Sequence, residues 1–366
     1  MTNRPRRERA QRHWGVHTAV SRRSILMGLG AVGAFLAVDL GTVAYANKWI
    51  GSPGARATFL DGFLAVYGRQ LGFRKNHAKG VAVSGYFDSN GNGRELSSAA
   101  VFQPGRIPVV GRFSLAGGDA HVADAPGTAR GLGLAFGFPD GWQWRTAMLN
   151  LPVFPDNSAR GFYDRLLASK PVAATKAPDP AAMKAFLTAH PETAAAMAII
   201  KKHPPTAGFG DSTFRGLNTF YFVNDDGART PVRWSFVPQQ SAPAPPSGDA
   251  NGLFDALIGQ LRTGPLRWRM LVTIAEPGDP LTDPTLEWPE DRRSVEVGML
   301  TLTSAATEAA GNARDINFDP LTLPDGIEAS DDPLLSARSD IYAASYRQRT
   351  GEPKAAPAVQ VPEARA

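Results

Sequence analysis

The chain has 366 residues and contains no cysteine. This absence excludes disulfide bonds, catalysis by a thiolate, and zinc sites that are built on cysteine ligands. It leaves the redox compartment open, because a protein without thiols can reside in an oxidising or a reducing environment. The length is sufficient for one large domain or for two domains of ordinary size.

Beyond its N-terminal end, the chain also lacks an excess of charge of either sign. The formal net charge is +5, and residues 1–46 alone carry seven arginines against Glu8 and Asp39. The rest of the chain is therefore neutral by the same count. Because a nucleic-acid-binding domain needs its basic residues on the folded body, we expect no nucleic-acid partner.

Residues 1–46 have the pattern of an export signal. Residues 21–26 read Ser-Arg-Arg-Ser-Ile-Leu, which is a twin-arginine motif. A mostly apolar run follows over 25–38, and residues 44–46 read Ala-Tyr-Ala, a small-residue cleavage site. The pattern predicts a periplasmic or exported protein that contacts the membrane only through this leader, if the leader is not cleaved. The alternative is an uncleaved N-terminal anchor, although the apolar run is short for a membrane span.

The body of the chain, residues 47–350, has the pattern of an α+β domain. Glycine (37) and proline (30) are both abundant, which is typical of many short strands and turns. Apolar spacing predicts helices over 47–76, 160–202 and 251–262. Short apolar runs predict antiparallel strands over 80–154, 220–237, 270–275 and 295–302, arranged around a barrel. The proline- and alanine-rich end, 351–366, is predicted to be disordered.

Few residues of the body are candidates for catalysis. Outside the leader there are four histidines, and two of them precede a proline at a predicted helix edge, where a structural role is usual. His77 differs because it lies in the segment Arg-Lys-Asn-His-Ala-Lys-Gly over residues 74–80. A lone histidine is more often structural than catalytic, so this segment needs further context. The four are His77, His121, His190 and His203.

That context comes from a series of motifs. Residues 74–80, followed by Gly85-Tyr86-Phe87, resemble the distal-histidine segment of haem catalases. Any one motif is weak, but the ordered set covers roughly residues 55–350, and such agreement by chance is improbable. The segments that match later in the same order are Gly111-Arg112-Phe113-Ser114, Arg130-Gly131, Asn150-Leu151-Pro152-Val153-Phe154, Asn218-Thr219-Phe220, Asp283-Pro284-Thr285-Leu286-Glu287-Trp288-Pro289, Asn317-Phe318-Asp319-Pro320, Pro324-Asp325-Gly326-Ile327-Glu328 and Arg338-Ser339-Asp340-Ile341-Tyr342.

The resemblance to the catalase superfamily implies an antiparallel β-barrel with flanking helices that binds a b-type haem (heme b). It implies Tyr342 as the iron ligand, in keeping with the tyrosine ligand of catalases. Arg338 lies one helical turn before it, and its permanent positive charge favours the phenolate. Further cofactor contacts implied by the family are Arg74, Arg112 and Arg349 to the haem propionates and Phe162 stacked on the macrocycle.

On the opposite side of the haem, the resemblance implies three catalytic residues. His77 would transfer a proton between the two oxygens of peroxide, a task suited to a group that titrates near neutrality. Asn150 would hold the peroxide by hydrogen bonds. Ser114 would orient the His77 ring, as partners behind a functional histidine do. Each of them could instead be an ordinary structural residue.

The chain also departs from the full catalase pattern. It lacks the long N-terminal arm and the C-terminal domain, so we expect a monomer or a dimer. Asn76 stands where catalases usually carry valine, and Thr128 stands in place of the channel aspartate. A more polar access route would admit hydrogen peroxide together with a small organic electron donor.

We therefore expect a haem peroxidase that reduces hydrogen peroxide, with organic peroxides as further candidates, through a ferryl intermediate on a tyrosinate-ligated haem. The alternatives are a short true catalase, a haem-binding protein without turnover, and an enzyme that rearranges lipid hydroperoxides.

Overall fold

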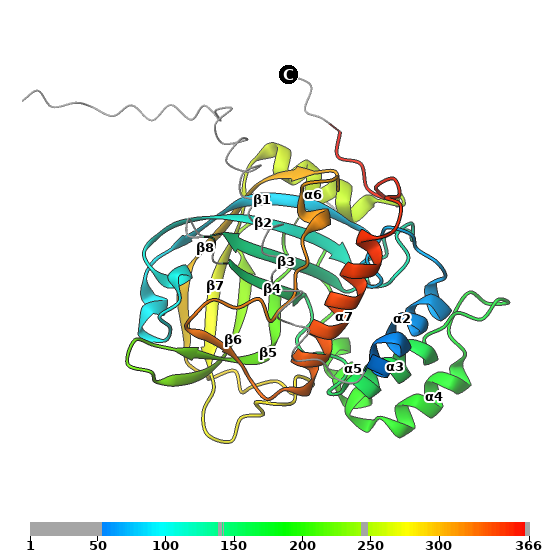
Figure 1. Cartoon of the computed structure of the whole chain (residues 1–366), viewed down its shortest axis with the longest axis horizontal. Helices are drawn as coiled ribbons and strands as arrows, with labels where there is room; N and C mark the ends of the chain where they lie inside the picture. The colour runs from blue at the N-terminus through cyan, green and yellow to red at the C-terminus, as the bar shows by residue number, and fades with distance from the viewer. Residues whose placement is uncertain (1–52, 138–140, 142, 243–247, 363–366) are drawn as a thin grey trace, which may run out of the picture.

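The computed structural model describes residues 53–137, 141, 143–242 and 248–362, so the predicted leader lies outside the described residues. Eight antiparallel strands follow one another around a barrel, which closes where Leu149 pairs with Arg215 (Figure 1). A short ninth strand adds to one edge, beside β5. The predicted barrel is thereby confirmed. Its strands are β1 (Gly80–Ser89), β2 (Gly105–Leu115), β3 (Arg130–Gly137), β4 (Gln143–Leu149), β5 (Phe214–Val223), β6 (Arg229–Pro238), β7 (Leu266–Ile274), β8 (Ser294–Ala306) and β9 (Ile327–Ala329).

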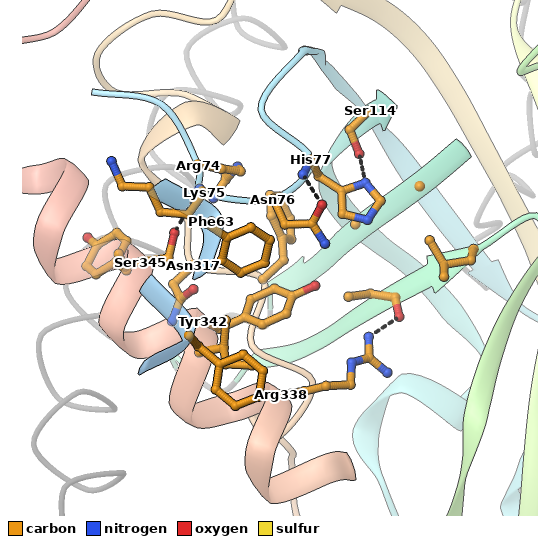
Figure 2. A pocket seen from close by; sticks show the side chains of 18 of the residues that line it. Phe63, Arg74, Lys75, Asn76, His77, Ser114, Asn317, Arg338, Tyr342 and Ser345 are labelled. Carbon is orange, nitrogen blue, oxygen red and sulfur yellow. Dashed lines mark hydrogen bonds between the residues drawn. The ribbon is translucent and has the colours of Figure 1, made fainter. Parts of the chain in front are cut away.

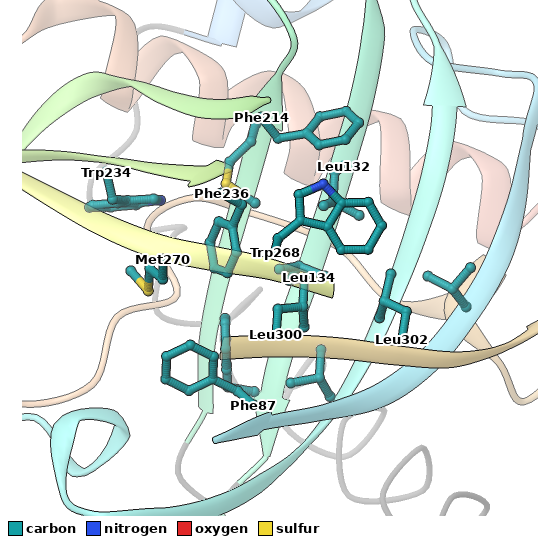
Figure 3. Packing of buried hydrophobic residues seen from close by; sticks show 14 of the residues in the cluster. Phe87, Leu132, Leu134, Phe214, Trp234, Phe236, Trp268, Met270, Leu300 and Leu302 are labelled. Carbon is teal, nitrogen blue, oxygen red and sulfur yellow. The ribbon is translucent and has the colours of Figure 1, made fainter. Parts of the chain in front are cut away.

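Large apolar side chains fill the barrel interior. Successive residues of a strand point to opposite faces, so every second residue of each strand enters the core. Trp268, Leu134 and Phe87 are completely buried there and meet side chains from the other strands, as Figure 3 shows. Because this space is already packed, a ligand has to bind on the outer face of the barrel wall.

Helices cover one end of that outer face. In Figure 1, α2 to α5 form a group beside the barrel, and α7 packs against α2 and α3. Asp179 caps α4, and a proline opens both α4 and α5. Among the described residues, none of the helices has the length and apolar character needed to span a membrane. The bounds are α2 (Pro53–Tyr67), α3 (Ala159–Ala168), α4 (Pro180–Ala189), α5 (Pro191–Lys202), α6 (Gly252–Thr263) and α7 (Pro333–Thr350).

Two expectations about the ends of the body differ from the structure. The helix expected over 47–76 ends at Tyr67, because Gly68 adopts a φ of 70° that stops the helix. Residues 47–52 lie outside the described residues. The tail from 351 was expected to be disordered, but residues up to 362 pack on the body. Glu352 forms an ion pair with Lys75 at 3.0 Å, and Val359 is completely buried. Contacts with distant parts of the chain thus order a segment whose composition predicts disorder.

A buried ion pair anchors the segment that follows His77. The ammonium of Lys79 lies 2.7 Å from Asp124, and the side chains of both are 2% exposed. Lys79 also donates to the carbonyls of Val122 and Ala250. Removing one partner of such a pair leaves the other charge buried and uncompensated. We therefore expect Asp124→Asn to lower the free energy of unfolding by about 3–5 kcal/mol, as measured by urea denaturation.

The matched control is Asp88→Asn. Asp88 pairs with Arg106 at 2.7 Å, but these side chains are 41% and 60% exposed. Water already solvates both groups, so the same substitution should change the free energy of unfolding by less than about 1 kcal/mol. Equal effects of the two substitutions would show that the Lys79 pair contributes no more than a surface pair.

Candidate active site

A cavity lies between the outer face of the barrel and the helices. Its empty space, counted together with the open solvent at its mouth, is about 1100 Å³, and most of the surface that lines it is apolar. Strand alternation decides which residues reach it: Arg112 and Ser114 of β2 point outward, whereas Phe113 between them enters the core. The residues that line the cavity and matter below are Phe59, Phe63, Arg74, Asn76, His77, Arg112, Ser114, Gly131, Gly133, Phe162, Phe318, Arg338, Tyr342 and Arg349.

His77 forms one wall of the cavity. Its Nδ1 lies 3.1 Å from the hydroxyl of Ser114, which leaves Nε2 toward the open space (Figure 2). The ring packs over β3 at Gly131, where a Cβ atom would come within 2.9 Å of Nδ1. The predicted pairing of His77 with Ser114 is therefore present, and the missing side chain at position 131 makes room for the imidazole.

The backbone of His77 is held in an uncommon conformation. Its φ is 55°, in the left-handed region that residues other than glycine rarely adopt. The side-chain oxygen of Asn76 accepts hydrogen bonds from the backbone N–H of His77 and of Gly117, each at 3.0 Å. Asn76, one of the two residues that depart from the catalase pattern, thus binds the loop together while it lines the cavity.

The surroundings of His77 keep its ring neutral. Desolvation comes first, followed by the positive charges of Arg112, Arg338 and Arg74, and together they lower the pKa of His77 to about 3. The imidazole is therefore neutral, the form that can accept a proton, at any pH at which the protein is expected to work.

This low pKa predicts a flat pH profile in acid. Only the neutral ring accepts a proton, so an ordinary histidine of pKa 6.5 would lose about 30-fold in rate between pH 8 and pH 5. For His77 the protonated form is populated only as the pH falls toward about 3. We therefore expect the rate constant for reaction with hydrogen peroxide to change by less than about twofold from pH 8 to pH 5, as measured by stopped-flow absorbance. A decline with a midpoint near 6.5 would contradict the buried, cation-flanked setting.

Tyr342 enters the cavity from the opposite wall. It lies on α7 with its phenol directed toward the space below His77, and Arg338 lies one turn earlier on the same helix (Figure 2). The Arg338 guanidinium donates to the side-chain oxygen of Asn218 and, at 3.1 Å, to the carbonyl of Ala147. The helical spacing of the two residues is thus confirmed, and the arginine is fixed to the barrel wall.

Asp332 is a part of this wall that was not among the residues expected from the sequence. It accepts a hydrogen bond from Asn218 at 2.6 Å and caps α7 through the N–H of Leu334. The network Asp332–Asn218–Arg338 therefore places the start of α7 against β5. The Asp-Pro pair at 332–333 is a helix-start signal that could have located the cap, but only the fold brings Asn218 to it.

Three arginines gather at one side of the cavity. Arg74 and Arg349 both donate to the carbonyl of Ile316, at 2.9 and 3.2 Å, so one loop fixes both side chains. Burial, then the like charges of Arg349 and Arg112, lower the pKa of Arg74, and burial lowers that of Arg349 to about 10. A cluster of buried like charges favours an anionic partner, and guanidinium suits carboxylates.

The third arginine of this cluster is already paired. Arg112 binds the carboxylate of Glu308 through Nε at 2.7 Å and through Nη2 at 2.9 Å. Although burial alone would raise the pKa of Glu308, Arg112, Arg74 and Arg349 hold it below its ordinary value. No sequence pattern indicates Glu308, because a single glutamate in an alanine-rich loop carries no signal of its surroundings.

The two remaining predicted residues have different outcomes. Phe162 of α3 lines the cavity and packs against Phe59 and Phe63, with ring centroids 6.0 and 6.2 Å away. Asn150 is not among the residues that line the cavity. Its side-chain oxygen accepts a hydrogen bond from the N–H of Arg130 at 2.7 Å, which fixes the turn after β4. The structure therefore brings together every predicted site residue except Asn150, whose contact with peroxide stays a prediction.

Comparisons with known proteins agree with this fold. The catalase family model matches residues 69–364. A catalase-related peroxidase of Synechococcus elongatus is 35% identical over 93% of this chain and 98% of its own length. A catalase-related peroxidase of Mycolicibacterium paratuberculosis is 31% identical over 82% of this chain and 97% of its own length. The mouse catalase is 27% identical over 75% of this chain, which spans 56% of that longer protein.

Solved structures show the same architecture. A bacterial catalase superposes with a TM-score of 0.69 at 23% identity, over 77% of this chain and 58% of that one. The chain therefore belongs to the catalase family. Within the family it groups with the short catalase-related peroxidases.

Proposed function

We propose that this chain is a haem peroxidase that reduces hydrogen peroxide with electrons from a small organic donor. Family membership supports an oxidoreductase that acts on peroxide. The observation that carries the proposal is the cavity in which the imidazole of His77 and the phenol of Tyr342 face the same space from opposite walls.

The residues present fit a b-type haem. The cavity lies between the barrel wall and the helices, and its lining is mostly apolar, as a porphyrin requires. Gly133 has no side chain, and a Cβ atom there would lie 2.8 Å from the Phe318 ring at the cavity wall. Tyr342 offers one oxygen ligand, while Arg74 and Arg349 offer cations for two carboxylates.

Each residue would have a defined task toward that group. Tyr342 would bind the iron as a phenolate, which the positive charge of Arg338 favours. When bound, the haem group as a whole would supply the two electrons that cleave the O–O bond of peroxide. His77 Nε2 would accept the proton of one peroxide oxygen and return it to the other, which departs as water. Ser114 would keep the ring in the orientation that this transfer requires.

The full reaction distinguishes a peroxidase from a catalase. In both, one peroxide takes up two electrons and two protons and becomes two waters. In a peroxidase an organic donor supplies them and is oxidised, whereas in a catalase a second peroxide supplies them and leaves as dioxygen. Asn76 adds a polar group to the cavity wall, where an organic donor can hydrogen-bond, which favours the peroxidase.

The test compares the two outcomes on one preparation. Protein expressed with haem available is mixed with hydrogen peroxide, and dioxygen release is measured with an electrode in parallel with oxidation of a phenolic or aromatic amine donor. We expect a ferric haem spectrum with a phenolate-to-iron band and faster donor oxidation than dioxygen release. Fast dioxygen release with negligible donor oxidation would instead identify a short true catalase.

We also propose that the protein is exported by the twin-arginine route and acts as a monomer or a dimer. The support for export is the motif at 21–26 with its small-residue site at 44–46. Cell fractionation of the wild type and of the double variant Arg22→Lys, Arg23→Lys tests the route, because the variant should be retained in the cytoplasm. Light scattering of the purified protein gives its oligomeric state.

A further inference from the structure

The pair of Glu308 and Arg112 lies directly behind the strained backbone of His77. Arg112 is 3% exposed, and besides Glu308 it binds two carbonyls of the histidine loop. Its Nη1 donates to the carbonyl of His77 at 2.7 Å, and its Nη2 donates to that of Ala78 at 3.0 Å. One guanidinium thus joins a buried carboxylate to the backbone of the residue that faces the cavity.

The contacts of Arg112 leave few of its N–H groups free to bind a haem carboxylate. A guanidinium has five N–H groups, and its two-pronged edge of Nε and Nη2 is the one that grips a carboxylate. Glu308 occupies that edge with contacts of 2.7 and 2.9 Å. The two backbone carbonyls take two further N–H groups. Arg74 and Arg349 donate to loop carbonyls, and among the described contacts neither of them binds a carboxylate. These two arginines are therefore better placed to bind propionates.

The strands are shaped for this arrangement. Gly80 of β1 pairs with Ser114 of β2, and a Cβ atom at Gly80 would lie 2.4 Å from the Arg112 guanidinium. The absence of a side chain therefore opens the path by which Arg112 reaches the carbonyl of His77. A left-handed non-glycine residue is strained and persists only where its surroundings hold it.

We infer that Glu308 is a positioning residue for His77: by binding the two-pronged edge of Arg112, it directs the rest of that guanidinium onto the carbonyls of His77 and Ala78. The inference deepens the proposed function, on which its kinetic readouts rest. Without the carboxylate, Arg112 turns toward the cavity, the loop relaxes, and the imidazole leaves the position in which it accepts a proton.

The test is Glu308→Gln, which keeps the size of the side chain and removes its charge. Hydrogen exchange of the haem-free protein, followed by mass spectrometry, should be about tenfold faster over residues 76–80 and unchanged over β5. In the haem-loaded protein, the rate constants for hydrogen peroxide and for cyanide, which sheds a proton as it binds, should both fall about tenfold or more. The rate of haem loss to an acceptor protein should change by less than about twofold.

Glu296→Gln is the matched control. Glu296 of β8 pairs with Arg269 at 3.2 Å, but both side chains are about 40% exposed and lie away from the cavity, so all three readouts should equal those of the wild type. Glu308→Asp retains the charge and serves as a second variant in case Glu308→Gln misfolds. Because its side chain is shorter, it should change the three readouts in the same direction as Glu308→Gln. Combining Glu308→Gln with Arg112→Lys should not add a second loss in rate, because both act on one contact.

The possible outcomes separate the two proposals. Unchanged exchange over residues 76–80 in both Glu308 variants would overturn the positioning role, whether or not the protein binds haem. Faster haem loss with unchanged rates per bound haem would show that Arg112 serves as a haem clamp instead. If the wild type neither binds haem nor reacts with peroxide, the proposed function fails, while the exchange measurement still decides the role of Glu308.

Discussion

Replacing Tyr342 by phenylalanine is expected to abolish the haem-dependent activity of this protein. Phenylalanine fills the same space on α7 but offers no oxygen to the iron. Loss of a residue that merely supports a metal ligand costs about 10–100-fold in affinity or activity, so loss of the ligand itself should exceed about 100-fold in haem affinity. The measurement is a haem titration of the purified variant, followed by its absorption spectrum and its steady-state oxidation of a phenolic donor.

The control for this variant is Tyr221→Phe. Tyr221 lies on β5, where Arg229 stacks on its ring at 4.1 Å, and it does not line the cavity. The Tyr221→Phe variant should have the haem affinity and the absorption spectrum of the wild type. If Tyr342→Phe bound haem with an unaltered spectrum, the phenol would not be the iron ligand, and the central assignment of the site would be wrong.

Replacing His77 by alanine is expected to separate haem binding from catalysis. The ring lines the cavity without belonging to the arginine cluster, so the variant should still take up haem. Loss of a general acid–base group typically slows a reaction by about 10²–10⁴-fold. We therefore expect a decrease of this size in the second-order rate constant for hydrogen peroxide, measured by stopped-flow absorbance of the haem-loaded protein.

His121→Ala provides the comparison for this second variant. His121 is exposed and touches Phe73 edge to face at 5.6 Å. It should react with peroxide at the rate of the wild type. A His77→Ala variant with the same peroxide reactivity as His121→Ala would favour a haem-binding protein whose chemistry does not use this histidine.

Features of the structure that depend on residue spacing or on the position of a proline could be predicted from the sequence. The barrel strands, the starts of α4 and α5, and the one-turn spacing of Arg338 and Tyr342 depend on local rules of strand alternation, proline placement and helical pitch. The ordered motifs placed His77, Ser114 and Tyr342 in one cavity, and the structure has them there. The predictions were less accurate where the chain depends on distant contacts, as in the order of residues 351–362.

By itself, the sequence determined the family, the barrel and the kinds of side chain that face each other across the cavity, because these follow from spacing along the chain. Only the tertiary structure decided which charges meet. It placed Glu308 on Arg112, joined Asp332 to Asn218, and directed the side chain of Asn150 to a backbone N–H at the end of the barrel wall. Burial gives these contacts their strength, and burial is a property of the packed whole that no local pattern encodes.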